Sequence, residues 1–176
     1  MPLVRVDHQS GHIRAALLGN EHLLDRERFL AAHISGGTTD VLLVEPHRDG
    51  PYRIETVGTS SDLHAGQFVD RVGVALGLPF PAGKHLEALA NTAAKKNVKL
   101  ASAVKNGTCS FSGAESSAQR LLHTVDDAEL AFGVYDCLAR TLCKLFAYAA
   151  NQYGDLPILI CGGVASSHLL RSEERR

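Results

Sequence analysis

Two histidines near the start of the chain are spaced as a metal-binding pair would be. His8 and His12 stand in the segment HQSGH, which continues into an apolar pattern typical of a helix. Residues at i and i+4 share one helix face, about 6 Å apart, and imidazole nitrogens suit zinc or iron. Because such a pair is more often a solvated helix face than a metal site, the spacing alone leaves both interpretations open.

A glycine-rich segment between two apolar runs is a candidate phosphate-binding turn. Ser35-Gly36-Gly37 follows the apolar residues 29–34 and is followed by Thr38, Thr39 and Asp40. Glycines let the backbone turn tightly and approach a ligand, while hydroxyl groups can contact phosphate oxygens. A glycine-rich β-turn that binds nothing explains the segment equally well.

A second glycine pair, Gly162-Gly163, stands where a predicted strand passes into a predicted helix. Without side chains, a flat ring or a phosphate can lie on the backbone, and a helix N-terminus favours anions. Close packing of the helix against the strand explains the pair nearly as well.

Asp70 and Glu87 are candidate acceptors for ligand hydroxyls, with Gly83 between them in the sequence. Asp70 falls on the polar side of one predicted helix, and Glu87 lies one turn into the next. Solvated or capping carboxylates are an equally good local interpretation of both.

Hydrophobic periodicity predicts the elements that position these residues. Apolar spacing indicates helices over 8–18, 62–76, 85–95, 115–123 and 126–154, and short apolar runs indicate strands over 29–34, 41–44, 52–57 and 157–161. Strands that form a meander and then alternate with helices predict an α/β domain with a mixed sheet and flanking helices. Residues 91–106 read as a linker, and Ser61 or Asp62 as the cap of the second helix.

The composition describes one ordinary domain. The 176 residues carry a formal net charge of −1, which gives no electrostatic case for nucleic-acid binding. No run approaches the ~20 apolar residues of a membrane span, and the first residues lack a signal-peptide layout, so we expect a cytoplasmic protein without membrane contact. Four cysteines without CxxC spacing are expected to be buried thiols: Cys109, Cys137, Cys143 and Cys161.

Six segments, taken in order, carry a family resemblance. They are HQSGH, ISGGTTD, GTSSDLHAGQFVDR, LGLPFPAG, CSFSG and GGVASSHLLR. The chain from Asp7 to Arg171 resembles the tRNA threonylcarbamoyladenosine transferase family, formerly known as glycoproteases, in the order and the spacing of these segments. Each segment is weak evidence singly, and six in the right order are strong evidence.

The resemblance implies an actin-like, sugar-kinase-like ATPase fold with two lobes and nucleotide in the cleft between them. It implies a divalent metal, iron or zinc, held by His8 and His12, and a transfer of threonylcarbamoyl from its adenylate to adenosine 37 of tRNA. In that role the metal would act as a Lewis acid. The ligand beside the metal, ATP or threonylcarbamoyl-adenylate, would contact His33, Ile34, Ser35, Gly36, Gly37, Asp70, Gly83 and Glu87.

Several motif positions depart from the family pattern. Ser167 stands where the family has an asparagine, and a hydroxyl can make one hydrogen bond there but cannot hold an adenosine as an amide does. Other motif positions, most of them polar in the family, also differ: Leu63, Gln67, Arg71, Thr38 and Ala82. A non-catalytic scaffold that binds a partner through the helix over 62–76 is therefore an alternative. A metallopeptidase is the last alternative, because no glutamate stands beside the histidine pair as a general base.

The family pattern extends beyond both ends of the chain. It includes a lobe before the HxxGH helix and a third metal ligand, an aspartate, after the GGV segment. We therefore expect residues 1–176 to be a partial actin-like domain, truncated at both ends. The resemblance implies tRNA and a homologous actin-like subunit as partners, and an apolar face left by the missing lobe predicts self-association.

Overall fold

The computed structural model describes residues 8–47 and 52–173, with side chains for residues 10–47 and 52–171. Six strands form one sheet: β1 (Phe29–Ile34), β2 (Thr39–Glu45), β3 (Arg53–Ser60), β4 (Ala103–Lys105), β5 (Thr108–Ser110) and β6 (Ile158–Cys161). The helices are α1 (His8–Ala16), α2 (Ala65–Ala75), α3 (Gly83–Ala90), α4 (Ser112–Leu121), α5 (Asp127–Tyr153) and α6 (His168–Glu173), with 3-10 turns η1 (Glu21–Asp25) and η2 (Val164–Ser166). Within the described ranges, no helix is both long and apolar enough to cross a membrane.

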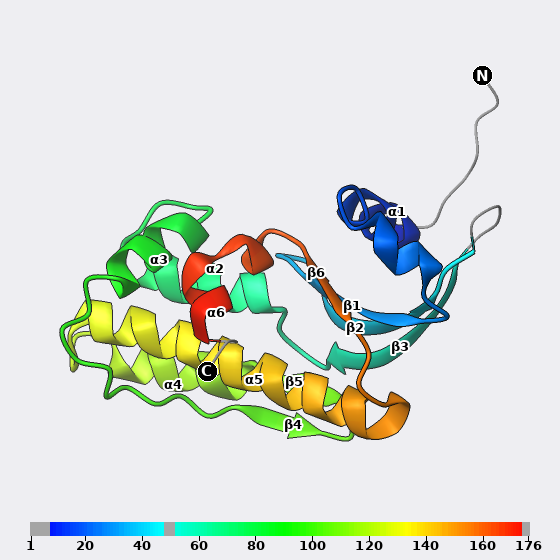
Figure 1. The fold of residues 1–176 in the computed structure, drawn as a ribbon. Helices are drawn as coiled ribbons and strands as arrows, with labels where there is room; N and C mark the ends of the chain where they lie inside the picture. The colour runs from blue at the N-terminus through cyan, green and yellow to red at the C-terminus, as the bar shows by residue number, and fades with distance from the viewer. Residues whose placement is uncertain (1–7, 48–51, 174–176) are drawn as a thin grey trace.

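The sheet is mixed, with strand order β4-β5-β3-β2-β1-β6. β1 pairs antiparallel with β2 and parallel with β6, and β3 pairs parallel with β5. The predicted α/β class with a mixed sheet and flanking helices is confirmed. Figure 1 shows α1 on one side of this sheet and the long helix α5 on the other.

Both faces of β1 are covered, and all six of its residues are buried. Successive side chains of a strand point to opposite faces. Phe29 and Ala31 pack in a cluster with Ile13 of α1, whereas Leu30 and Ile34 pack in the larger cluster that includes α2 and α5. This arrangement explains why the apolar residues of β1 fall on both faces of the strand rather than alternating with polar ones.

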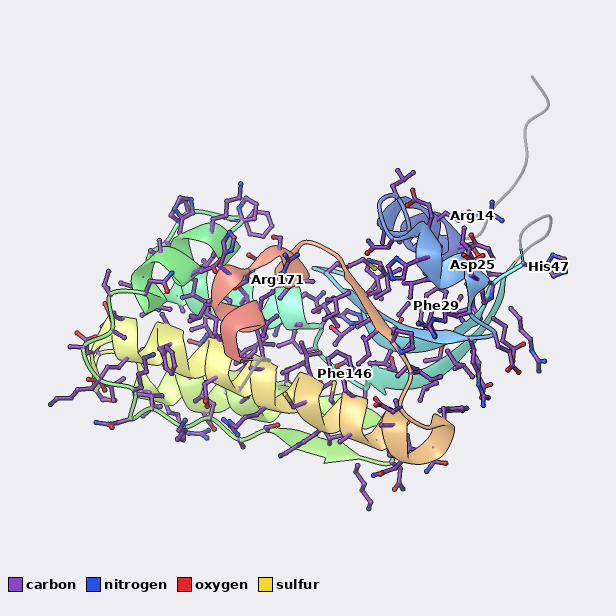
Figure 2. The ribbon with its side chains drawn as sticks, in the orientation of Figure 1. Arg14, Asp25, Phe29, His47, Phe146 and Arg171 are labelled. Carbon is purple, nitrogen blue, oxygen red and sulfur yellow. The ribbon has the colours of Figure 1, made fainter. Side chains whose placement is uncertain are left out.

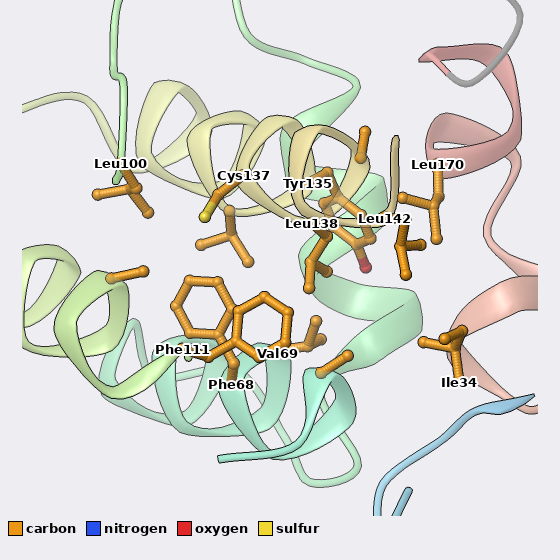
Figure 3. Close-up of a cluster of buried hydrophobic side chains, with 14 of the residues drawn as sticks. Ile34, Phe68, Val69, Leu100, Phe111, Tyr135, Cys137, Leu138, Leu142 and Leu170 are labelled. Carbon is orange, nitrogen blue, oxygen red and sulfur yellow. The ribbon is translucent and has the colours of Figure 1, made fainter. Parts of the chain in front are cut away.

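Helix α5 is bounded by the residues that its sequence predicts. Asp126 caps it, because the side-chain oxygen accepts hydrogen bonds from the amides of Ala128 and Glu129 at 3.0 and 3.1 Å. Gly154 ends it in a left-handed conformation with φ 85°. Beneath α5, the rings of Phe68 and Phe111 stack with centroids 5.6 Å apart, which joins α2 to the start of α4 (Figure 3).

The predicted linker over 91–106 is wrong. Val98 and Leu100 are buried in the main core, and Arg140 of α5 donates a hydrogen bond to the carbonyl of Leu100 at 2.6 Å. The last part of the segment forms β4 at the sheet edge. The apolar residues of this segment are isolated among lysines and asparagines, so the sequence did not predict that it packs along α5.

The predicted cap at Ser61 or Asp62 is also wrong, because α2 begins at Ala65. The Asp62 carboxylate instead accepts hydrogen bonds from the hydroxyls of Ser110 and Ser112, at 2.6 and 2.5 Å, and from the amide of Phe111 at 3.0 Å. Partial burial opposes ionisation, but these hydrogen bonds outweigh it and hold the pKa of Asp62 well below its usual range. Asp62 thus ties the entry of α2 to the entry of α4.

Three of the four cysteines are wholly or partly buried, as predicted, and Cys143 is exposed, which corrects the prediction for that residue. Burial raises the pKa of Cys109 to about 11, and it also raises the pKa of Cys137 and of Cys161. Protonated, buried thiols behave as small apolar side chains rather than nucleophiles.

Candidate functional site

The carboxyl ends of the parallel strands β1 and β6 meet at one edge of the sheet, and the glycine-rich segments follow directly from them. In open α/β sheets this edge is where ligands bind. Gly162 has φ 104°, and a Cβ there would lie 2.2 Å from the carbonyl oxygen of Ile34. The glycine therefore lets the chain leave β6 in close contact with the end of β1.

The turn after β1 is fixed against the first turn of α2. The amide of Gly66 donates to the carbonyl of Ser35 at 3.1 Å, and the amide of Ala65 donates to the hydroxyl of Thr39 at 2.8 Å. A Cβ on Gly66 would lie 2.6 Å from the Cα of Gly36. The turn and the helix are thus in backbone-to-backbone contact, which only glycine permits.

A cavity of about 610 Å³ opens beside this junction. Five of the predicted ligand-contacting residues, from four separate segments, line it together: Gly36, Asp70, Gly83, Glu87 and Ser167. Gly163 of the second glycine pair also lines it. Of the remaining predicted contacts, Ile34 is buried in the main core, and Ser35 and Gly37 lie in the turn beside Gly36.

The two predicted carboxylates hold the cavity walls in place. Asp70 Oδ1 accepts a hydrogen bond from the amide of Ala82 at 2.8 Å, and Glu87 Oε1 accepts one from the amide of Leu169 at 2.9 Å. A carboxylate has about four lone-pair sites, so one amide contact leaves capacity for a ligand hydroxyl. Ser167 accepts from the amide of Leu170 at 3.2 Å, at the start of α6.

Among the lining residues that the sequence did not single out, three carry a phenol or a basic group: Tyr135, Lys84 and His85. The Tyr135 hydroxyl donates to the carbonyl of Gly83 at 2.8 Å. Burial, and then the negative charges of Glu87 and Asp70, raise the pKa of Tyr135 above its usual value, which keeps the hydroxyl a donor. Tyr135 lies within the apolar pattern of α5 and gives no local signal, whereas Lys84 and His85 directly follow Gly83 and place basic groups at the rim.

The predicted metal pair is only partly within the described side chains. His8 opens α1, but its side chain lies outside them. His12 is exposed, and its ring lies against the ring of His33 from β1, with centroids 4.3 Å apart. Among the described residues no group of three His, Cys, Asp or Glu is placed to hold a metal ion. Imidazole nitrogens, which His12 presents and which the sequence predicts for His8, are donors that zinc and iron accept.

Solved structures define the fold class. T. kodakarensis HypF aligns with 99% of this chain, and this chain covers 32% of HypF, at a TM-score of 0.77 and 14% identity. The activator of the 2-hydroxyisocaproyl-CoA dehydratase from Clostridium difficile, solved with bound ADPNP, has a TM-score of 0.60 at 15% identity, with 97% of this chain and 57% of that chain covered. The chain has the actin-like ATPase fold.

Sequence comparisons then give the family. The family model of TsaD, tRNA N6-adenosine threonylcarbamoyltransferase, matches residues 1–176, so the chain belongs to that family. The tRNA N6-adenosine threonylcarbamoyltransferase of Geobacillus thermodenitrificans is 34% identical over 98% of this chain and 51% of its own length. That of Caulobacter vibrioides is 34% identical over 97% of this chain and 48% of its own. The chain spans about half the length of the curated relatives it matches.

Proposed function

We propose that this chain forms the metal- and adenylate-binding lobe of a tRNA threonylcarbamoyltransferase, with residues 1–176 a partial actin-like domain. The activity of the whole protein would be the transfer of a threonylcarbamoyl group from its adenylate to the exocyclic amine of adenosine 37 in tRNA. The observation that carries the proposal is the convergence on one cavity of residues from four separate family motifs, Gly36, Asp70, Gly83 and Ser167, together with Glu87, which follows the third of these motifs.

The cavity would bind the adenylate through its backbone and its acids. Gly36 and Gly163 leave room for a phosphate or a flat ring against the main chain. Asp70 and Glu87 would accept hydrogen bonds from ribose hydroxyls while still holding the amides that shape the walls. Ser167 would supply one hydrogen bond to the adenosine.

The histidine-bearing helix would hold the metal next to this ligand. His8 and His12, one turn apart on α1, would be protein ligands to zinc or iron. When bound, the ion supplies Lewis-acid polarisation of the acyl-adenylate. α1 is held over the sheet by its buried residue Ile13, by the buried Leu17 directly after it, and by Arg14, whose guanidinium carbon lies 4.6 Å from the centre of the Tyr52 ring.

Kinship supports the partners and the location. A tRNA substrate, a homologous actin-like subunit and a cytoplasmic location all follow from the family's reaction. Self-association would use exposed apolar side chains such as Leu18, Phe80 and Ile158, the last of which lies on the edge strand β6.

A transfer assay tests the proposed function. Protein carrying this chain is given threonylcarbamoyl-adenylate and tRNA, and the modified nucleoside is measured by mass spectrometry. We expect the double substitution His8→Ala/His12→Ala to lower the rate at least about 100-fold, since loss of Lewis-acid stabilisation removes several kcal/mol from the transition state. Lys105→Ala, an exposed residue outside the cavity, should react at the wild-type rate. Equal rates for the wild type and the double variant would contradict the metal's role.

A non-catalytic scaffold is the second candidate function. It is favoured by Leu63, which is buried in the main core at a position where the family motif has an aspartate. In that case the wild-type chain would show no transfer but would still bind the homologous subunit through α2. The older metallopeptidase assignment has the least support, because no glutamate stands between or beside His8 and His12 in the helix.

A further inference from the structure

Tyr135 is a buried residue of α5 that borders the 610 Å³ cavity. It is 2% exposed, yet it lines the cavity together with Asp70 and Glu87. Figure 3 shows it among the apolar side chains of the main core, on the same helix as Leu138 and Leu142. Phenylalanine would fill that space equally well, so the hydroxyl indicates a function beyond packing.

Two buried residues of α5 carry hydroxyl groups, and they use them differently. Thr141 donates to the carbonyl of Cys137 at 2.7 Å, a bond within its own helix that is common for threonine. Tyr135 instead reaches out of α5 and donates to the carbonyl of Gly83 at 2.8 Å, in the first turn of α3. Its hydroxyl therefore lies where α5 meets α3 at the cavity.

Two carboxylates lie around the same turn of α3. Asp70 of α2 accepts a hydrogen bond from the amide of Ala82, the residue before Gly83, at 2.8 Å, and Glu87 lies one turn further along α3. Both act on the phenol, because burial, and then the charges of Glu87 and Asp70, raise the pKa of Tyr135. Asp70, Glu87 and Tyr135 thus form one cluster, which we call the α3 polar group.

The basic groups near the cavity are bound elsewhere or exposed. Arg171 of α6 (Figure 2) donates to the carbonyl of Ala165 at 2.9 Å and does not line the cavity. Lys84 and His85 line it but are exposed, so solvent and salt screen their charges. The α3 polar group is therefore an acidic environment that would repel a phosphate.

A ribose matches the hydrogen-bonding capacity of the α3 polar group. It brings two hydroxyl protons, which the two carboxylates can accept. Each ribose oxygen can accept a hydrogen bond in turn, and of the three side chains only the phenol can donate one. Its proton can turn from the Gly83 carbonyl to the ligand, or be shared between them, because hydroxyl protons rotate to suit their partners.

We propose that Tyr135 is a specificity-determining residue of this cavity, which donates its phenol proton to a ribose hydroxyl whose own proton goes to Asp70 or Glu87. The inference rests on the proposed nucleotide-binding function and adds a contact from α5, which lies outside all six family segments. Hydrogen bonds linked in this way strengthen one another in a dry site. The cavity therefore prefers a ribonucleotide to the deoxynucleotide that lacks this hydroxyl.

Titration with nucleotides that differ by one hydroxyl tests the inference. Protein carrying this chain is titrated calorimetrically with a non-hydrolysable ATP analogue and with its 2′-deoxy and 3′-deoxy forms. We expect the wild type to bind the ribose form at least about tenfold more tightly than the deoxy form that lacks the contacted hydroxyl. Tyr135→Phe should lower that preference about fivefold, the effect of one hydrogen bond, and leave the preference for the other hydroxyl unchanged.

A tyrosine further along the same helix provides a matched control. Tyr148 does not line the cavity and lies 13 residues beyond Tyr135, about 20 Å along α5. Tyr148→Phe should keep both preferences of the wild type. Tyr135→Phe should lower the melting temperature by no more than about 4 °C, because the ring stays and one neutral hydrogen bond is lost.

The comparison between ligands separates the possible failures. A merely structural effect of Tyr135→Phe would weaken all three nucleotides by the same factor. That result, or no effect at all, would refute the role of Tyr135 and leave the proposed nucleotide site standing, provided that the wild type binds the ATP analogue. If the wild type binds none of the three nucleotides, both proposals are refuted.

Discussion

Replacing Gly162 by alanine is expected to destabilise the chain by about 3 kcal/mol or more. A side chain at φ 104° costs about 1–3 kcal/mol in backbone strain, and its Cβ would lie 2.2 Å from the carbonyl oxygen of Ile34 and 2.7 Å from the carbonyl carbon. Those neighbours are backbone atoms of β1, which is paired on both sides, and they cannot rotate away. For a chain of this size, the loss corresponds to a fall in melting temperature of roughly 6–12 °C, measurable by circular dichroism.

The adjacent Gly163 provides a matched control. It has φ −63°, and a Cβ there would meet nothing within 4 Å. Gly163→Ala should therefore change the melting temperature by no more than about 2 °C, within the range of ordinary surface substitutions. Equal behaviour of the two variants would show that β6 does not leave the sheet against β1 as described.

Replacing Gly66 by alanine is expected to lower the free energy of unfolding by about 2 kcal/mol, the reverse of the usual effect in a helix. Alanine normally stabilises a helix by about 1 kcal/mol relative to glycine. Here the new Cβ would lie 2.6 Å from the Cα and 2.7 Å from the amide nitrogen of Gly36, and overpacking of this kind costs about 1–3 kcal/mol. Chemical denaturation measures the difference.

The same substitution at Gly11 tests whether the effect belongs to the contact. Gly11 lies inside α1, where an added Cβ meets nothing within 4 Å, so Gly11→Ala should stabilise the chain by up to about 1 kcal/mol. If Gly66→Ala were also stabilising, the turn after β1 would not rest on α2, and the cavity wall described above would lose its basis.

Most of the fold could be predicted because its elements have strong local patterns. The largely apolar run of β1 and the long periodic helix between Asp126 and Gly154 can each be recognised within a short window of sequence. The segment over 91–106 could not be predicted in this way. Val98 and Leu100 are single apolar residues in a polar stretch, and only their distant contact with α5 explains their burial.

The same distinction between local and distant information applies to Asp62. Its spacing to the next apolar residues suggests a helix cap, but three of its hydrogen-bond partners lie 48 to 50 residues later in the chain. No local pattern reports a contact at that sequence separation. Both segments, GTSSD and CSFSG, belong to the family resemblance, but their order along the chain does not indicate that they are in contact.

The residues of the candidate site could be predicted almost entirely from the family resemblance. Glycine pairs and single carboxylates are ambiguous in isolation, and their shared cavity is a property of the folded chain. Tyr135 was missed because an aromatic residue inside an apolar helix face looks like core. His33 does not line the cavity, and its ring lies against that of His12 in α1. Side chains of a strand point alternately to opposite faces of the sheet, so closeness in sequence to the glycine-rich turn does not place this ring in the cavity. The ligand roles of all these residues stay predictions.

Calorimetric titration with a non-hydrolysable ATP analogue tests the central claim, an adenylate site in the cavity beside the β1 turn. We expect saturable binding by the wild-type chain and unchanged binding for Lys105→Ala. When Asp70→Asn and Glu87→Gln are combined, we expect binding at least about tenfold weaker, because each lost charge-assisted hydrogen bond to a ribose hydroxyl costs about 1 kcal/mol or more. Lys105 lines a separate hollow with Ser61 and Cys109. Absence of saturable binding, or binding lost only in Lys105→Ala, would contradict the account.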